Sequence, residues 1–163
     1  MPLDQPSAAP PPPNKRINTS FIGRSWPPTD VYLVGREKIR EFATAIGATD
    51  ALHHDPEAAR TAGYADVVAP PTFPTVVTMK ASRQIIDDPD LGLDYSRVVH
   101  GDQRFAFARP IVAGDTLVCV NTVEEILERG GHHFITTRTD VTTEAGEPVV
   151  TGWSKLVQRG AEQ

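Results

Sequence analysis

Residues 67–86 read VVAPPTFPTVVTMKASRQII, and this stretch decides the fold. From residue 73 onwards the apolar side chains recur at helical spacing, at Phe73, Val76, Val77, Ala81 and Ile85. A stripe of this kind predicts a long, well-buried central helix over 73–86. Thr72 is the expected N-cap, and Pro74 is tolerated because it falls in the first turn.

In the C-terminal half the apolar side chains recur at every second residue. Four segments alternate apolar and polar residues and are rich in β-branched side chains, namely 104–109, 116–123, 134–141 and 149–157. Turn signals containing proline or glycine separate them. We therefore expect about four antiparallel strands joined as a meander and packed on the long helix, which is an α+β fold.

Two further helices are expected before the central one. Residues 35–46 carry apolar side chains on one face and charges on the other, and Gly47 ends the pattern. Residues 56–63 predict a short helix with Asp55 as N-cap, Pro56 at the first position and Gly63 as terminator.

The chain has 163 residues, which fits one domain. Six prolines and almost no large apolar side chains occur in the first fifteen residues, so that segment cannot bury enough surface to order itself. We expect a disordered tail over 1–17, a folded domain over 18–158 and a C-terminal tail over 159–163. The proline-rich start lacks the features of a secretory signal.

Net charge and cysteine content limit the binding partners and the cellular compartment that we expect. The net charge of −5 argues against nucleic acid or an anionic membrane as the main partner, and no apolar run is long enough to span a bilayer. Cys119 is the single cysteine, which excludes an internal disulfide, and its apolar surroundings predict a buried side chain. A cytoplasmic location is the default expectation.

Four stretches carry a family resemblance: 34–42 (VGREKIREF), 55–64 (DPEAARTAGY), 68–73 (VAPPTF) and 107–115 (FARPIVAGD). Together they resemble the MaoC family of R-specific hydratases and dehydratases, over roughly residues 18–158. The resemblance is to the FAS1-type, N-terminal MaoC-like domain, a branch that includes the first subunit of the mycolic-acid dehydratase. It implies a hotdog fold, in which an antiparallel sheet wraps a long central helix.

The resemblance also implies a reaction, the dehydration of (3R)-hydroxyacyl thioesters on acyl carrier protein or CoA in fatty-acid or polyketide metabolism. The reaction removes the α-proton, protonates the departing hydroxyl and stabilises an enolate-like oxygen. A His beside an Asp can divide the first two duties, and a backbone N–H can stabilise the oxygen. No organic cofactor or metal is needed, because the thioester itself acidifies the α-carbon.

In active relatives a segment Gly-Asp-x-Asn-Pro-Ile/Leu-His supplies this chemistry. Aligned on this chain it becomes residues 47–53, GATDALH, which retains His53. The acid position is Ala48, which cannot transfer a proton. Asp50 lies two residues later and could replace the acid only if the loop were rebuilt.

A second departure concerns the donor to the thioester oxygen. Active relatives have a glycine N–H where this chain has Pro71, and proline has no N–H. The resemblance therefore implies a non-catalytic half that pairs through its sheet edge with a second MaoC hotdog subunit, or with itself if that partner is absent. The acyl chain would contact Pro71, Thr72, Phe73, Val76 and Val77.

Other readings of individual residues remain open. His53 is either an auxiliary site residue or a solvated loop histidine. A metal site at His53, His54 and Asp55 is disfavoured, because adjacent loop residues rarely aim at one ion. Residues 100–103 (HGDQ) are interpreted first as a structural turn, with the lining of a substrate channel as the alternative. Trp26 and Trp153 are expected in the core or at an interface.

Three other function classes are weighed. A self-sufficient dehydratase would depend on His53. A thioesterase would need a carboxylate on the central helix, but residues 73–86 contain no Asp or Glu. A non-enzymatic module that binds acyl thioesters predicts the same fold and cavity, so the sequence does not separate it from a dehydratase subunit.

Overall fold

The computed structural model describes residues 16–160. Its helical elements are η1 (Thr19–Phe21), α1 (Arg36–Ala45), η2 (Ala51–His53), α2 (Pro56–Thr61), α3 (Pro74–Ile86) and η3 (Tyr95–Arg97). Its strands are β1 (Tyr32–Leu33), β2 (Val98–Phe107), β3 (Thr116–Arg129), β4 (His132–Thr143) and β5 (Pro148–Gln158). The proline-rich segment 1–15 and residues 161–163 lie outside the described residues.

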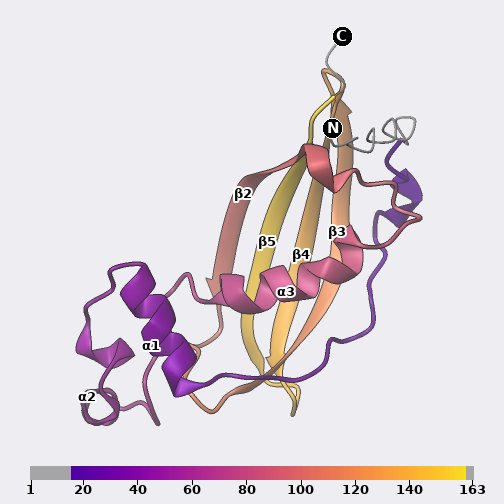
Figure 1. Ribbon diagram of the computed structural model, residues 1–163. Coiled ribbons are helices and arrows are strands. Elements are labelled where there is room, and N and C mark those ends of the chain that lie inside the picture. Colours follow the sequence, from indigo (N-terminus) through magenta and orange to yellow (C-terminus); the bar gives the residue numbers. More distant parts are fainter. Residues whose placement is uncertain (1–15, 161–163) are drawn as a thin grey trace, which may run out of the picture.

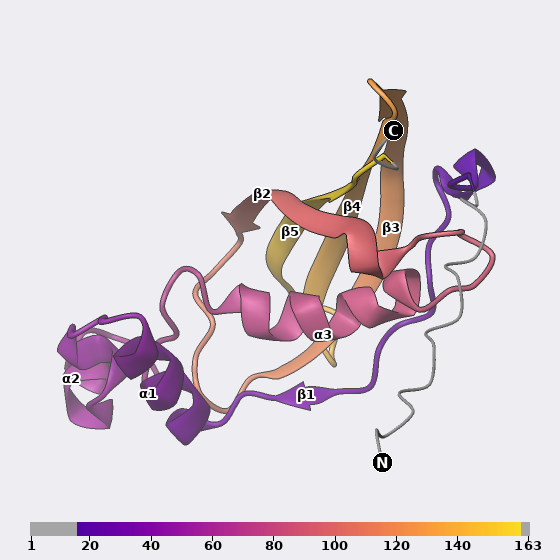
Figure 2. The ribbon, with the colours of Figure 1, turned by 45° about the horizontal axis from the view of Figure 1, so that its top comes forward.

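One antiparallel sheet contains all five strands, in the order β1-β3-β4-β5-β2. Helix α3 lies across one face of this sheet (Figure 1). After a turn of the view, α3 lies between β1 on one side and β2, β5 and β4 on the other (Figure 2). This is the hotdog arrangement, and the expected α+β class is confirmed.

The predicted meander is only partly correct. Strands β3, β4 and β5 follow one another as hairpins, but β2 pairs with β5 at the far edge instead of with β3. The pairing is non-local, so alternation within each segment did not reveal it. The two-residue strand β1 was not predicted, and residues 100–103 belong to β2, so the structural turn expected there is wrong.

The predicted helices are confirmed, with one corrected cap. Asp55 caps α2, since its carboxylate accepts from the Glu57 N–H. The N-cap of α3 is Phe73, which makes no side-chain cap bond, so the capping role expected for Thr72 is wrong. Phe73 already has helical backbone angles, so the chain turns before the first residue of α3 and the helix starts without an extended, side-chain-capped residue.

The buried face of α3 joins two apolar clusters. Phe73, Val77 and Ala81 pack with α1 and one end of the sheet in the first cluster, whereas Ile85 belongs to the second cluster. Ile17, expected in the tail, is also buried in this second cluster. Cys119 is buried as predicted, and burial raises the pKa of its thiol to about 11.

Asn121 is the polar anchor between helix and sheet. Its side chain is wholly buried, its amide donates to the Ala81 carbonyl and to Gln84 Oε1 at 2.9 Å each, and its Oδ1 accepts from Thr139 at 2.8 Å. Helix α3 contacts β3 most and β4 and β5 less. The helix is therefore fixed over one side of the sheet.

Among residues 16–160, no helix has both the length and the apolar character that a bilayer crossing requires.

We predict that Asn121→Ala lowers the free energy of unfolding by about 2–4 kcal/mol, because it removes three hydrogen bonds and leaves the Ala81 carbonyl and the Thr139 hydroxyl buried without this partner. Urea denaturation measures this loss. Thr122→Ala is the matched control, since the next side chain in β3 lies on the opposite face and bonds only Ser25. A loss for Asn121→Ala no larger than for the control would contradict the anchoring role.

Candidate functional site

His53 ends the short helix η2, which packs against the approach to α3. The Val68 N–H donates to the Leu52 carbonyl at 2.8 Å, and His53 Nδ1 lies 2.6 Å from the Val68 carbonyl oxygen. A carbonyl oxygen can only accept, so Nδ1 carries a proton, and in the neutral imidazole Nε2 is then the lone-pair nitrogen. His53 is therefore oriented as a base by a backbone group.

The imidazole borders a cavity of about 280 Å³. Besides His53, the cavity is lined by Val68, Ala69, Pro71, Phe107 and Pro110. None of these residues carries a carboxylate. The lining therefore provides a proton acceptor in an apolar setting but provides no acid to work beside it.

The two candidate acid positions have structural roles. The Ala48 carbonyl accepts from His54 Nε2 at 2.8 Å, which closes the loop between α1 and η2. The Asp50 carboxylate is exposed and accepts from the Leu52 N–H at 2.9 Å, so it caps η2. The loop is not rebuilt to bring Asp50 into the lining of the His53 cavity.

Pro71 lies in the same cavity wall, at the position where active relatives supply a donor. Two N–H groups that follow it are already used, since Phe73 donates to the Pro70 carbonyl at 2.9 Å and Thr75 donates to the Thr72 carbonyl at 3.1 Å. The N-terminal end of α3 thus lacks a donor from residue 71.

A larger cavity of about 580 Å³ runs along α3 above β4, β5 and β2. It adjoins the His53 cavity, because Thr72 lines the larger cavity and its neighbour Pro71 lines the smaller one. Phe105 and Phe107 line one cavity each, with ring centroids 6.4 Å apart. The two cavities are thus lined by neighbouring residues of the same two segments, the approach to α3 and the end of β2.

Hydroxyl groups are prominent in the larger cavity. Seven of its lining side chains are Ser or Thr: Thr72, Thr75, Thr78, Ser82, Thr137, Thr139 and Ser154. The sequence reasoning missed this set. The signal on α3 was present, because residues 72, 75, 78 and 82 are spaced to share one helix face.

The five expected wall residues do not share one cavity. Pro71 and Thr72 line the two cavities just described. Phe73 is wholly buried in the core, Val76 is half-buried beside it, and Val77 borders a separate cavity near residues 28–32.

The expected turn 100–103 also contributes to the site. His100 and Gln103 point from β2 into the larger cavity, which agrees with the channel alternative. Within residues 16–160, no group of three or more His, Cys, Asp or Glu side chains is arranged to hold a metal ion.

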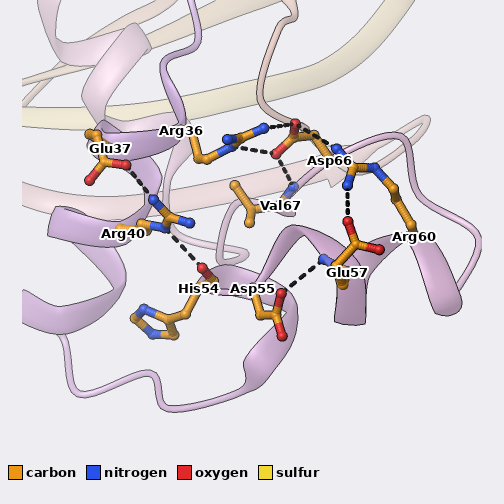
Figure 3. Close-up of polar contacts among 9 residues, drawn as sticks. All are labelled: Arg36, Glu37, Arg40, His54, Asp55, Glu57, Arg60, Asp66 and Val67. Carbon is orange, nitrogen blue, oxygen red and sulfur yellow. Dashed lines mark hydrogen bonds and ion pairs between the residues drawn. The ribbon is translucent and has the colours of Figure 1, made fainter.

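An ionic network holds the His53 loop in place (Figure 3). Asp66 accepts two hydrogen bonds from Arg36 of α1, one of them 2.9 Å long, and also accepts from the Val67 N–H. Arg60 of α2 lies 3.9 Å from the same carboxylate, and Arg40 donates to the His54 carbonyl at 2.9 Å. The network thus connects α1, α2 and the approach to α3.

The Arg36 guanidinium, helped by the Val67 N–H and by Arg60, holds the pKa of Asp66 at about 2, below its usual 3.8. A depressed carboxylate pKa stabilises the fold above pH 3.8, and the contribution is lost as the pH falls through about 2.

Comparison with known proteins gives one consistent picture. The family model described as FAS1-like, dehydratase domain region, matches residues 20–152. A UPF0336 protein of Streptomyces avermitilis is 56% identical over 147 residues, which cover 90% of this chain and 98% of that protein.

Two solved structures are similar at 34% identity. The first is the HadBC (3R)-hydroxyacyl-ACP dehydratase complex of Mycobacterium tuberculosis, with a TM-score of 0.78 over 84% of this chain and 96% of that chain. The second is a MaoC-like dehydratase, with a TM-score of 0.80 over 87% of this chain. The present chain spans only 43% of that longer one.

We predict that Asp66→Asn lowers the free energy of unfolding at pH 7 by about 1 kcal/mol, a modest value because the arginine partners are partly exposed. The difference from the wild-type protein should shrink as the pH falls from 4 towards 2, since the wild-type carboxylate then protonates. Denaturation at a series of pH values measures it. Asp30→Asn, at an exposed carboxylate, is the matched control, and a pH-independent difference would contradict the assignment.

Proposed function

Because this chain belongs to the MaoC-like hotdog dehydratase family, we propose that it is the substrate-binding, non-catalytic half of a heterodimeric dehydratase. Its substrates are (3R)-hydroxyacyl thioesters on acyl carrier protein or CoA. One observation carries the proposal: an oriented His53 borders a cavity without any carboxylate, next to a larger cavity suited to an elongated ligand.

The chemistry explains why such a chain needs a partner. Dehydration requires a base, an acid and a donor to the thioester oxygen, and this chain has at most the base. Loss of a single oxyanion donor costs about a hundred- to a thousand-fold in rate. The partner therefore supplies the Asp/His pair, and this chain supplies the wall along α3.

The outer edge of β2 is the surface proposed for that partner. Among the described strands this ten-residue strand pairs with β5 alone, and it contains neither lysine nor proline, two of the features that protect an exposed edge. Large exposed apolar side chains lie on or beside it: Met79, Tyr95, Val99 and Phe107. A second hotdog sheet that pairs with β2 would cover both the edge and these side chains.

The comparisons support pairing of two domains. The similar Mycobacterium tuberculosis structure is a complex, and more than half of the longer MaoC-like chain lies outside the matched region. That remainder is long enough for a second domain of this size. The single buried cysteine agrees with the cytoplasmic location expected from composition.

We predict that the purified chain alone hydrates an enoyl thioester at less than about 1% of the rate of the complex with a partner carrying an intact Gly-Asp-x-Asn-Pro-x-His motif. Co-expression, co-purification and a spectrophotometric hydration assay measure both rates. Full activity of the chain alone, abolished by His53→Ala, would overturn the non-catalytic assignment. Binding of acyl thioesters without turnover by either preparation would favour the non-enzymatic module.

A second prediction concerns the interface. Val99→Lys should weaken association with the partner at least about ten-fold, because it places a charge beside the pairing edge. Analytical ultracentrifugation of the co-purified complex measures the dissociation constant. Leu33→Lys is the matched control, since Leu33 is a large exposed apolar side chain on β1 at the opposite edge. Equal weakening by both changes, or by neither, would exclude the β2 edge.

A further inference from the structure

A β-bulge in β2 determines which side chains enter the cavity along α3. The register with β5 shifts between His100 and Asp102, so Gly101 is the extra residue. A Cβ atom on Gly101 would lie 3.0 Å from Val157 Cγ2 and 3.4 Å from the Lys155 carbonyl oxygen, so a larger residue would force Val157 to shift. Glycine therefore permits the bulge at this point.

The bulge brings two polar side chains to one face. His100 and Gln103 are three residues apart, and in a regular strand they would point to opposite faces. Because one residue is inserted between them, both line the cavity. His100 Nε2 lies 3.2 Å from Gln103 Oε1 and 3.1 Å from Ser154 Oγ of the neighbouring strand β5.

The hydrogen-bond pattern defines the roles of these atoms. Gln103 Nε2 donates to the Trp153 carbonyl at 2.9 Å, so Oε1 is the amide atom that faces His100. Oε1 can only accept, and His100 Nε2 must therefore carry a proton. The same N–H also points to Ser154 Oγ, which leaves the Ser154 hydroxyl hydrogen available to a ligand in the cavity.

The helix side of the cavity is polar as well. Thr75 and Thr78 of α3 line it opposite the sheet, and Thr137 and Thr139 line its floor. Gly152 keeps this floor open for the Phe105 ring, since a Cβ there would lie 3.1 Å from Phe105 Cε1. The Thr139 and Ser82 hydroxyls already donate within the protein, to Asn121 Oδ1 and to the Met79 carbonyl, so they are not free for a ligand, whereas the Ser154 hydroxyl hydrogen is.

We infer that the cavity along α3 selects acyl chains that carry a further oxygen substituent beyond the third carbon, a hydroxyl or a keto group, and that Ser154 donates a hydrogen bond to that oxygen. The inference rests on the proposed function, because it assigns the substrate class of the same cavity. An unsubstituted chain displaces water from Ser154 without replacing its hydrogen bond, whereas an oxygenated chain replaces it. His100 and Gln103 are positioning residues that orient the Ser154 hydroxyl.

Direct binding tests this selection without any need for turnover. The probes are pantetheine thioesters with an acyl chain of about eight carbons, either unsubstituted or with one hydroxyl or keto group at successive carbons beyond the third. Calorimetry on the full chain, alone and in the co-purified complex, measures their dissociation constants. We expect one substituted probe to bind about 3- to 10-fold more tightly than the unsubstituted probe, the gain typical of one hydrogen bond.

Ser154→Ala should reduce the ratio of the two dissociation constants to about 1. Ser25→Ala, the same change at an exposed hydroxyl beside β3, should leave the ratio unchanged. Equal binding of all probes by the wild-type protein, or a preference that persists in Ser154→Ala, would overturn the inference and leave the proposed function standing. Failure of every acyl probe to bind either preparation would overturn both.

Discussion

The packing of α3 against the concave face of the sheet is the contact on which the rest of the structure depends. Phe73, Val77, Ala81 and Ile85 bury one stripe of the helix in two apolar clusters. Burial alone would allow the helix to slide, because apolar contact is non-directional. Asn121 removes that freedom, since its amide meets the carbonyl of one residue, Ala81.

The off-centre position of α3 creates the cavity. The helix contacts β3 most, and the space beside it over β5 and β2 remains open as the larger cavity. Its N-terminal end also lies at the His53 loop, where Pro71 lines the smaller cavity and Thr72 the larger one. The position of both cavities thus follows from one packing arrangement.

Local patterns predicted the elements and missed the relations between them. Periodicity found α1, α3 and four strands, because each buries one face. It did not find the pairing of β2 with β5, because the paired residues lie about fifty positions apart in the sequence. It also did not find the bulge at Gly101, which turns the His100 side chain to the same face of the sheet as Gln103. Helical spacing also named Phe73, but spacing cannot distinguish a face turned to the core from one turned to a cavity.

The retained histidine has a structural reason to be present. His53 Nδ1 bonds the Val68 carbonyl and joins η2 to the segment that leads into α3, a role that requires no acid at residue 48 and no N–H at residue 71. In the proposed non-catalytic half, absence of the acid and of the donor would therefore leave the loop intact, with the wall of the adjoining cavity still in place. A hotdog domain can in this way lose its chemistry and keep its capacity to bind, provided that a partner brings the missing groups to the same ligand.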